Sequence, residues 1–198
     1  MSLFMSRADA DAWEGARTLA DLGELTAQWL EGRIASQPGY ATGCGPDPET
    51  AELIPVLAKI NRAGFVTETS QPGFANLPGA NGGSWSQRAA VEGYAEPVVA
   101  GPLAERAREA ELNVALFKAP VRRLRRAEYE DFIVTLCDGQ PRTGLASQPR
   151  KSQQRDRYGV TNALDEIRRA WQLTIASPDY AADTTLWDLL DEWADGRH

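Results

Sequence analysis

Histidine is almost missing from this sequence, because the only copy among 198 residues is His198. We therefore expect no Ser-His-Asp triad, no Cys-His pair and no histidine metal cluster. Cysteine is scarce as well: Cys44 and Cys137 cannot form a disulfide framework, and neither has a metal-type partner nearby. Any chemistry should then use carboxylates, hydroxyls, tyrosines or a bound ligand.

Long hydrophobic runs are also missing. No apolar segment approaches the roughly 20 residues needed to span a bilayer, and the first residues do not form a secretory signal. We expect a cytoplasmic protein without a membrane partner. The hydrophobic fraction of 42% and charged fraction of 25% are typical of a globular chain. We predict a flexible N-terminus over residues 1–8 and a single domain over 9–198.

The charge balance is acidic, with a net charge of −7, which argues against a nucleic-acid partner. The basic residues nevertheless gather in two places. One cluster is Arg122, Arg123, Arg125 and Arg126, and a polar loop over residues 138–158 carries Arg142, Arg150, Lys151, Arg155 and Arg157. Two interpretations stay open: a solvated face with a polar loop, or a lid that attracts an anionic substrate.

Hydrophobic periodicity predicts helices and strands that do not alternate strictly. Helices are expected over residues 19–34, 51–63, 86–95, 101–111 and 162–170, and from residue 185 onward. Strands are expected over 65–69, 112–118, 132–137 and 171–176. This order favours an α+β fold with a mixed β-sheet flanked by helices. Because the GxGxxG and P-loop motifs are both missing, a Rossmann fold is not expected.

Pro55 sets the start of the second predicted helix. Proline fits the first turn of a helix but not its interior, so the helix should begin near Ala51. Glu49 and Thr50 would then lie at its N-terminal end, where backbone N–H groups are free to bind a ligand. Taken alone, these two residues are more typical of a simple helix cap than of a ligand site.

Two segments, PETAELIPVLAKINRAGFVTETSQPG and GGSWSQRAAVEGY, carry the strongest family signal. They resemble the C-terminal regulatory domain of eukaryotic methylenetetrahydrofolate reductase, which binds S-adenosylmethionine. The positions in register are Glu49-Thr50, Asn61-Arg62-Ala63-Gly64, Thr67, Ser70-Gln71-Pro72, Gly82-Gly83, Gln87, Ala89 and Glu92, with weaker matches at Gly23-Glu24-Leu25 and Asp179-Tyr180. The catalytic flavin-binding barrel of that enzyme has no counterpart, so reductase activity and FAD are not implied.

The resemblance implies a set of cofactor contacts. They fall on Glu49, Thr50, Thr67 and Ser70, with Thr135 and Asp21 in a looser register. The chemistry agrees, since a carboxylate can face the sulfonium or ammonium while hydroxyls and helix N–H groups bind the cofactor's carboxylate. Trp85 or Tyr94 could stack on the adenine or face the sulfonium.

Two classes of function remain open. The first is a small stand-alone methyltransferase acting on a small-molecule acceptor, with S-adenosylhomocysteine as product and without metal or FAD. Methyl transfer needs mainly positioning of the two reactants, so the shortage of histidine is no obstacle. The alternative is a non-catalytic sensor of the two ligands that regulates a partner protein. Cleavage of the cofactor, transfer of its aminocarboxypropyl group and a homodimeric state are further options.

Overall fold

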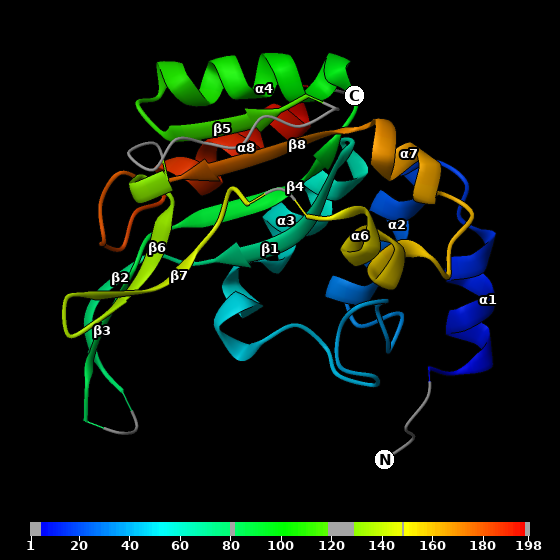
Figure 1. The fold of residues 1–198 in the computed structure, drawn as a ribbon, viewed down its shortest axis with the longest axis horizontal. Coiled ribbons are helices and arrows are strands. Elements are labelled where there is room, and N and C mark those ends of the chain that lie inside the picture. The colour runs from blue at the N-terminus through cyan, green and yellow to red at the C-terminus, as the bar shows by residue number, and fades with distance from the viewer. Residues whose placement is uncertain (1–4, 80–81, 119–128, 148, 197–198) are drawn as a thin grey trace.

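The computed structural model describes residues 5–79, 82–118, 129–147 and 149–196. Its centre is an antiparallel sheet with strand order β1 (Phe65–Gln71), β4 (Ala90–Ala95), β8 (Trp171–Ala176) and β5 (Asn113–Phe117). Every residue of β4 is buried, because this strand is paired on both sides and covered on both faces. Figure 1 shows these strands stacked beside one another across the middle of the molecule.

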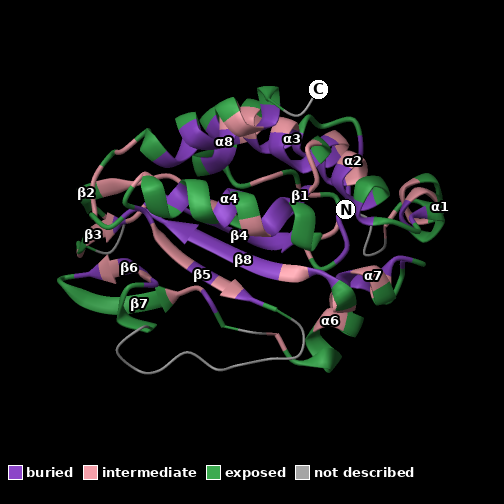
Figure 2. Cartoon of the chain, turned by 90° about the horizontal axis from the view of Figure 1, so that it is seen from above, coloured by how far each residue is buried: buried purple, intermediate pink, exposed green. Residues whose placement is uncertain are grey.

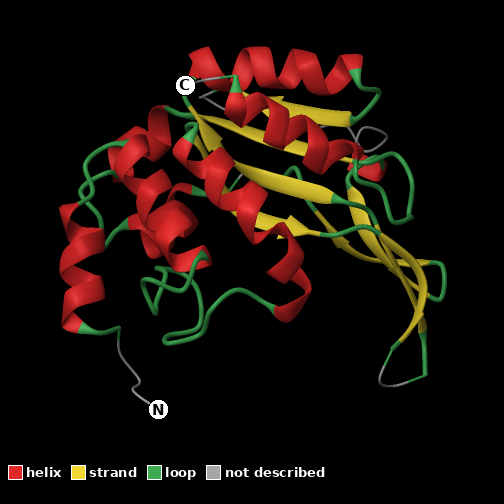
Figure 3. Cartoon of the chain, turned by 180° about the vertical axis from the view of Figure 1, so that it is seen from behind, coloured by secondary structure: helices red, strands yellow, loops and turns green. Residues whose placement is uncertain are grey.

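Helices cover one face of this first sheet. The largest hydrophobic cluster joins its strands to α2 (Leu19–Leu30), α3 (Ile54–Arg62), α4 (Pro97–Glu109) and α8 (Thr185–Asp195). Figure 3 shows helices crossing in front of the strands, and Figure 2 shows buried residues concentrated between the two layers. A second cluster packs α1 (Arg7–Gly15) and α7 (Leu164–Arg169) against α2 and Tyr158, the last residue of α6 (Lys151–Tyr158).

A second antiparallel sheet projects from the first, in the order β2 (Phe74–Pro78), β3 (Ser84–Gln87), β6 (Ile133–Cys137) and β7 (Gln140–Gly144). The chain passes from β1 into β2 through Pro72 and Gly73. Gly73 is required there, since a Cβ atom would lie 2.1 Å from the carbonyl oxygen of Ala181. A third cluster, which includes Ala115, Phe132 and Val134, joins the two sheets.

The expected single-domain α+β fold is confirmed, and the arrangement is not Rossmann-like. One correction concerns the sheet, which was expected to be mixed. All strand pairs between described residues are antiparallel, and they form two sheets instead of one.

The prediction of a helix over residues 86–95 was wrong, because this segment contributes to β3 and forms β4. The start of the next helix was also misplaced: α4 begins at Pro97 and includes Pro102 in its interior. The expected polar loop over residues 138–158 contains β7 and α6. The strands at 112–118, 132–137 and 171–176 were predicted to within one residue at each end.

The flexible N-terminus predicted over residues 1–8 overlaps the first helix. Helix α1 begins at Arg7, and its N-cap residue Ser6 accepts a hydrogen bond from the backbone N–H of Asp9 at 3.0 Å. Residues 1–4 lie outside the described ranges. The basic cluster of Arg122, Arg123, Arg125 and Arg126 lies outside them too.

Candidate functional site

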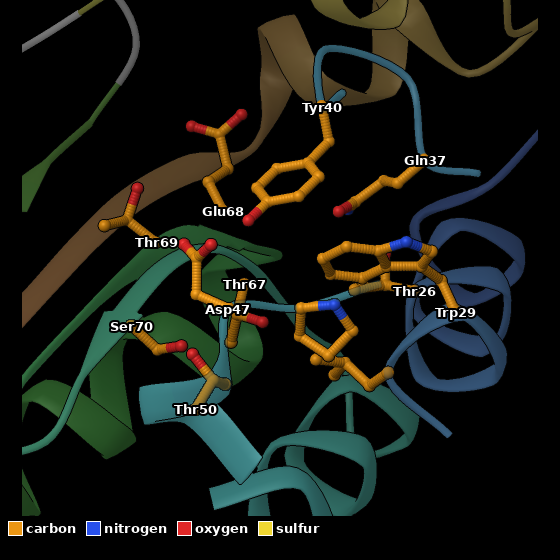
Figure 4. A pocket seen from close by; sticks show the side chains of 12 residues that line it. Thr26, Trp29, Gln37, Tyr40, Asp47, Thr50, Thr67, Glu68, Thr69 and Ser70 are labelled. Atoms are coloured by element: carbon orange, nitrogen blue, oxygen red, sulfur yellow. The ribbon is translucent and has the colours of Figure 1, made fainter. Parts of the chain in front are cut away.

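A polar pocket, here called pocket 1, lies between α2, the loop that follows it, the 3₁₀ helix η1 (Pro48–Leu53) and strand β1 (Figure 4). Its volume is about 160 Å³. The lining residues are Thr26, Trp29, Leu30, Gln37, Tyr40, Pro46, Asp47, Thr50, Thr67, Glu68, Thr69 and Ser70.

A β-bulge in β1 explains how four consecutive residues of one strand reach the same pocket. Thr67 is paired with Gly93 and Thr69 with Glu92, so Glu68 is the extra residue in the β1–β4 ladder. In a regular strand, side chains alternate between the two faces, whereas a bulge redirects them. The bulge therefore places residues 67–70 along one wall of pocket 1.

Asn61, at the end of α3, fixes the first residue of this wall. Its side-chain amide donates to the hydroxyl of Thr67 at 2.7 Å and to the carbonyl of Leu57 at 2.8 Å. Its side-chain oxygen accepts from the backbone N–H of Thr67 at 2.9 Å. Because Asn61 is fully buried, this pair of contacts gives Thr67 a single fixed position.

Two aromatic rings form the opposite end of pocket 1. Trp29 and Tyr40 meet edge to face, with ring centroids 5.1 Å apart and an interplanar angle of 63°. The indole N–H of Trp29 donates to the carbonyl of Cys44 at 3.1 Å, which anchors the loop carrying Tyr40 and Asp47. Burial of the Tyr40 hydroxyl, together with its hydrogen bond to Asp47, raises the pKa of Tyr40 to about 12.

The carboxylate of Asp47 lies beside the Tyr40 hydroxyl in Figure 4, while Thr50 and Ser70 face each other further along the pocket. The hydroxyl of Tyr40 stays protonated near neutral pH, so it acts as a donor to Asp47. Pocket 1 is thus lined by two acidic residues, Asp47 and Glu68, by several hydroxyls and by two aromatic rings.

Glu68 links the rim of pocket 1 to α6. Its carboxylate accepts from the Tyr158 hydroxyl at 2.7 Å and lies 3.3 Å from Nε of Arg157. The Arg157 guanidinium also donates to the backbone carbonyl of Glu68 at 3.1 Å. Burial, followed by the nearby charge of Glu68, raises the pKa of Tyr158 well above its usual value. The Tyr158 ring in turn packs edge to face on Tyr94.

A second cavity, pocket 2, has a volume of about 920 Å³. It is lined by Glu49, Pro72, Gly73, Phe74, Leu77, Pro78, Gly79, Gly83, Trp85, Cys137, Asp138 and Arg142. Two chain segments contribute to both cavities. In η1, Glu49 lines pocket 2 and Thr50 lines pocket 1. At the end of β1, Ser70 lines pocket 1 and the nearby Pro72 lines pocket 2.

Comparison with known proteins gives a family but no activity. A family model described as a domain of unknown function, DUF6919, matches residues 8–194. The chain belongs to the DUF6919 family. No curated protein matches it. The resemblance to the reductase regulatory domain therefore stays a prediction.

Three of the six predicted contact residues come together in this DUF6919 domain. Thr50, Thr67 and Ser70 all line pocket 1, and they come from η1 and β1. Glu49 is next to them but lines pocket 2. Glu49 and Thr50 lie within η1 and not at the open end of an α-helix, since α3 begins only at Ile54.

The other two predicted residues lie elsewhere. Asp21 completes the capping box of α2, where its carboxylate accepts from the backbone N–H groups of Arg17 and Thr18 at 2.9 and 3.0 Å. These bonds lower the pKa of Asp21, and the side chain serves to cap the N-terminus of α2. Thr135 is buried in β6, where it is paired with Gln87 and Thr143. Neither residue lines pocket 1.

The other aromatic and acidic candidate residues lie in different parts of the structure. Trp85 lines pocket 2, whereas Tyr94 is buried under Tyr158 and lines neither pocket. Glu92 is buried within the first sheet and accepts from the Thr174 hydroxyl at 2.6 Å and the Ala146 N–H at 2.7 Å. Among Glu49, Glu92, Tyr94 and Arg142, only Glu49 and Arg142 line pocket 2.

The loop side of pocket 1, with Tyr40 and Asp47, was not predicted from the sequence. Trp29 also lines the pocket, although only 6% of its surface is exposed, a burial typical of a core residue. The available signal was the Gly/Pro/Asp-rich segment ATGCGPDPET, since binding residues are often on loops held by a rigid scaffold.

Within the described ranges, no group of three or more His, Cys, Asp or Glu residues is arranged to hold a metal ion. None of the helices described here has the length and apolar character needed to cross a membrane.

Proposed function

We propose that pocket 1 binds S-adenosylmethionine and that the protein is a small methyltransferase acting on a small-molecule acceptor. The observation that carries this proposal is the meeting of Thr50, Thr67 and Ser70 in one pocket. Their positions followed from a family register spanning 21 residues from Thr50 to Ser70, which local caps and turns do not dictate.

The chemical groups of pocket 1 fit this ligand. Asp47 offers a carboxylate to the ammonium or sulfonium group, and the hydroxyls of Thr50 and Ser70 can donate to the ligand's carboxylate. Trp29 and Tyr40 offer aromatic faces for adenine or for a cation, which aromatic rings attract through their negative faces.

The size of the cavity limits how the ligand would lie. A volume of 160 Å³ is smaller than the roughly 300–1,000 Å³ of typical ligand pockets. Part of S-adenosylmethionine must then extend beyond pocket 1, and the segments that carry Thr50 and Ser70 also supply Glu49 and Pro72 to pocket 2. Glu49, the neighbour of Thr50 in the chain, would lie beside the extended part, which supports its predicted role as a cofactor contact.

When bound, S-adenosylmethionine supplies an electrophilic methyl group. The chain's contribution would be to orient the acceptor and to remove water from it. Pocket 2 offers an apolar space for the acceptor next to Glu49, whose carboxylate could take up a proton that the acceptor releases. S-Adenosylhomocysteine would be the product.

The sensor alternative is favoured by one specific contact. Glu68 lines pocket 1 and is also bound by Arg157 and Tyr158 of α6, so a ligand that displaced its carboxylate would weaken the attachment of that helix. A protein partner that binds α6 would then respond to the presence of ligand in pocket 1. A cytoplasmic location, a homodimer and the absence of nucleic-acid and membrane partners stay predictions under either function.

Calorimetric titration with S-adenosylmethionine and S-adenosylhomocysteine tests the shared claim. We expect Asp47→Asn to weaken binding by about 10- to 100-fold, because hydrogen bonds to charged groups contribute about 1.5–3 kcal/mol. Ser70→Ala should weaken it by about 2- to 10-fold. Asp156→Asn and Ser152→Ala, both on the exposed side of α6, are matched controls and should leave the affinity unchanged.

The outcomes separate the hypotheses. Failure of both ligands to bind would overturn the proposal for both functions. Transfer of labelled methyl groups from S-adenosylmethionine to a small-molecule acceptor would establish methyltransferase activity. Tight binding without turnover, together with ligand-dependent exposure of α6, would favour the sensor.

A further inference from the structure

Pocket 2 has the properties of a binding site in its own right. Its volume of 920 Å³ lies within the range of roughly 300–1,000 Å³ that is typical for small-molecule sites. The hairpin of β2 and β3 forms one wall, the turn between β6 and β7 forms another, and η1 contributes Glu49. Three separate parts of the chain therefore line this one open cavity.

The walls favour a flat apolar group. Phe74 and Trp85 are half-buried and Leu77 keeps 49% of its surface exposed, so three large apolar side chains line one cavity and are still accessible to a ligand. The Trp85 ring lies against Gly79, where a Cβ atom would come within 2.3 Å of the indole nitrogen. The backbone of Gly79 therefore supports the ring, which is pre-positioned for stacking.

The charges of pocket 2 favour a cation. Glu49 and Asp138 are acidic and Arg142 is basic, and none of the three takes part in an ion pair between described residues. Asp138 accepts from the Ser84 N–H through Oδ1 at 2.9 Å, while Oδ2 has, among the described residues, only the weak thiol contact of Cys137 at 3.8 Å. That second oxygen retains acceptor capacity for a ligand.

We propose that pocket 2 binds a small organic molecule with an aromatic ring and a protonated amine. The ring would lie against Trp85 and Phe74, and the ammonium would face the carboxylates of Asp138 and Glu49. A protein with a net charge of −7 also attracts such a cation from solution. That this molecule is the methyl acceptor rests on the proposed function, whereas the binding site itself does not.

The test uses three probes with the same ring and chain: 2-phenylethylamine, 2-phenylethanol and 3-phenylpropionate. Each is titrated into ¹⁵N-labelled protein, and the indole N–H resonance of Trp85 is followed after its assignment with Trp85→Phe. We expect saturable shifts of this resonance, with the amine binding about two- to fivefold more tightly than the alcohol and the carboxylate binding most weakly.

Asp138→Asn provides the decisive variant. Asp138 has a φ of +52°, a conformation that asparagine tolerates well, and the amide oxygen can still accept from Ser84. The variant should lower affinity for the amine about two- to fivefold and leave the alcohol unchanged. Asp156→Asn on α6 is the matched control and should alter neither affinity.

Three results would overturn the proposal: no saturable shift at Trp85 with any probe, binding of the carboxylate as tight as that of the amine, or an Asp138→Asn variant with unaltered preference. Calorimetry with S-adenosylhomocysteine on the same samples keeps the two hypotheses apart. Binding of the amine without S-adenosylhomocysteine would retain pocket 2 and reject the proposed function, and the reverse result would reject only pocket 2.

Discussion

At the scale of single residues, the close approach of α2 to α3 depends on Gly23. A Cβ atom on this residue would lie 2.3 Å from the backbone carbonyl oxygen of Asn61. Asn61 is the residue that holds Thr67 in the wall of pocket 1. Gly23 therefore affects both the packing of α2 on α3 and, through Asn61, the position of Thr67 in pocket 1.

We expect Gly23→Ala to lower the free energy of unfolding by about 1–3 kcal/mol, the usual cost of forcing extra volume into a packed site. Denaturant unfolding measures the change. Gly15→Ala is the matched control, because no atom lies within 4 Å of a Cβ at Gly15. That substitution, at the end of α1, should be neutral or stabilising by up to about 1 kcal/mol. Equal stability of the two variants would show that α2 can move away from α3 without cost.

Residue patterns predicted one side of the candidate site better than the other. Thr50, Thr67 and Ser70 were found because they belong to a contiguous motif with fixed spacing. Tyr40 and Asp47 come from a loop whose path depends on the Trp29 indole bond to Cys44, a contact between residues 15 positions apart. Sequence periodicity carries no information about such a contact, so this side of pocket 1 was missed.

At the scale of elements, the wrong helix over residues 86–95 has a physical explanation. Strand β4 is buried on both faces, so it lacks the alternation that identifies a half-exposed strand. Gly93 allows β1 to approach, since a Cβ there would lie 2.2 Å from the carbonyl oxygen of Val66. The tertiary pairing of β4 with β1 and β8 thus overrides the local preference of its residues.

Helix α6 offers a prediction at the same scale. Its sequence, KSQQRDRY, has no apolar stripe, and it is attached to β1 through the contacts of Arg157 and Tyr158 with Glu68. Those contacts involve side chains only 25% and 12% exposed for Arg157 and Glu68. We expect Glu68→Gln to accelerate hydrogen exchange of the α6 amides about tenfold or more, because a charged hydrogen bond contributes about 1.5–3 kcal/mol.

Exchange measured by mass spectrometry on peptides covering residues 151–158 gives the result. Glu166→Gln is the matched control, since its pair with Arg169 is a largely exposed i,i+3 contact within α7. Such pairs contribute only about 0.3–0.5 kcal/mol, so exchange in α6 should not change. If Glu68→Gln left α6 equally protected, Glu68 would not hold the helix, and the sensor alternative would lose its structural basis.

At the scale of the whole molecule, Glu92 connects the two sheets. It lies in β4, accepts from Thr174 in β8, and accepts from the backbone of Ala146, just after β7 of the second sheet. Burial raises the pKa of this carboxyl, and the hydrogen bonds from Thr174 and Ala146 offset only part of that effect. The folded protein therefore binds the proton of Glu92 more tightly than the unfolded chain does.

The sign of the pH dependence follows from this difference. Between the ordinary pKa of 4.5 and the raised pKa in the folded state, unfolding releases a proton, so the contribution of Glu92 to stability falls as pH rises. Glu92→Gln removes this titration. The free energy of unfolding of the variant, minus that of the natural protein, should become more positive as pH rises through this window and then stay constant.

Urea denaturation of both proteins from pH 4 to 8 measures this difference. Asp21, Glu24, Glu31 and Asp183 have lowered pKa values and push stability in the opposite direction as pH rises. They are present in both proteins, so their contributions cancel in the difference, which isolates Glu92. A difference that is independent of pH would mean that water reaches Glu92 and that the junction between the two sheets is open in solution.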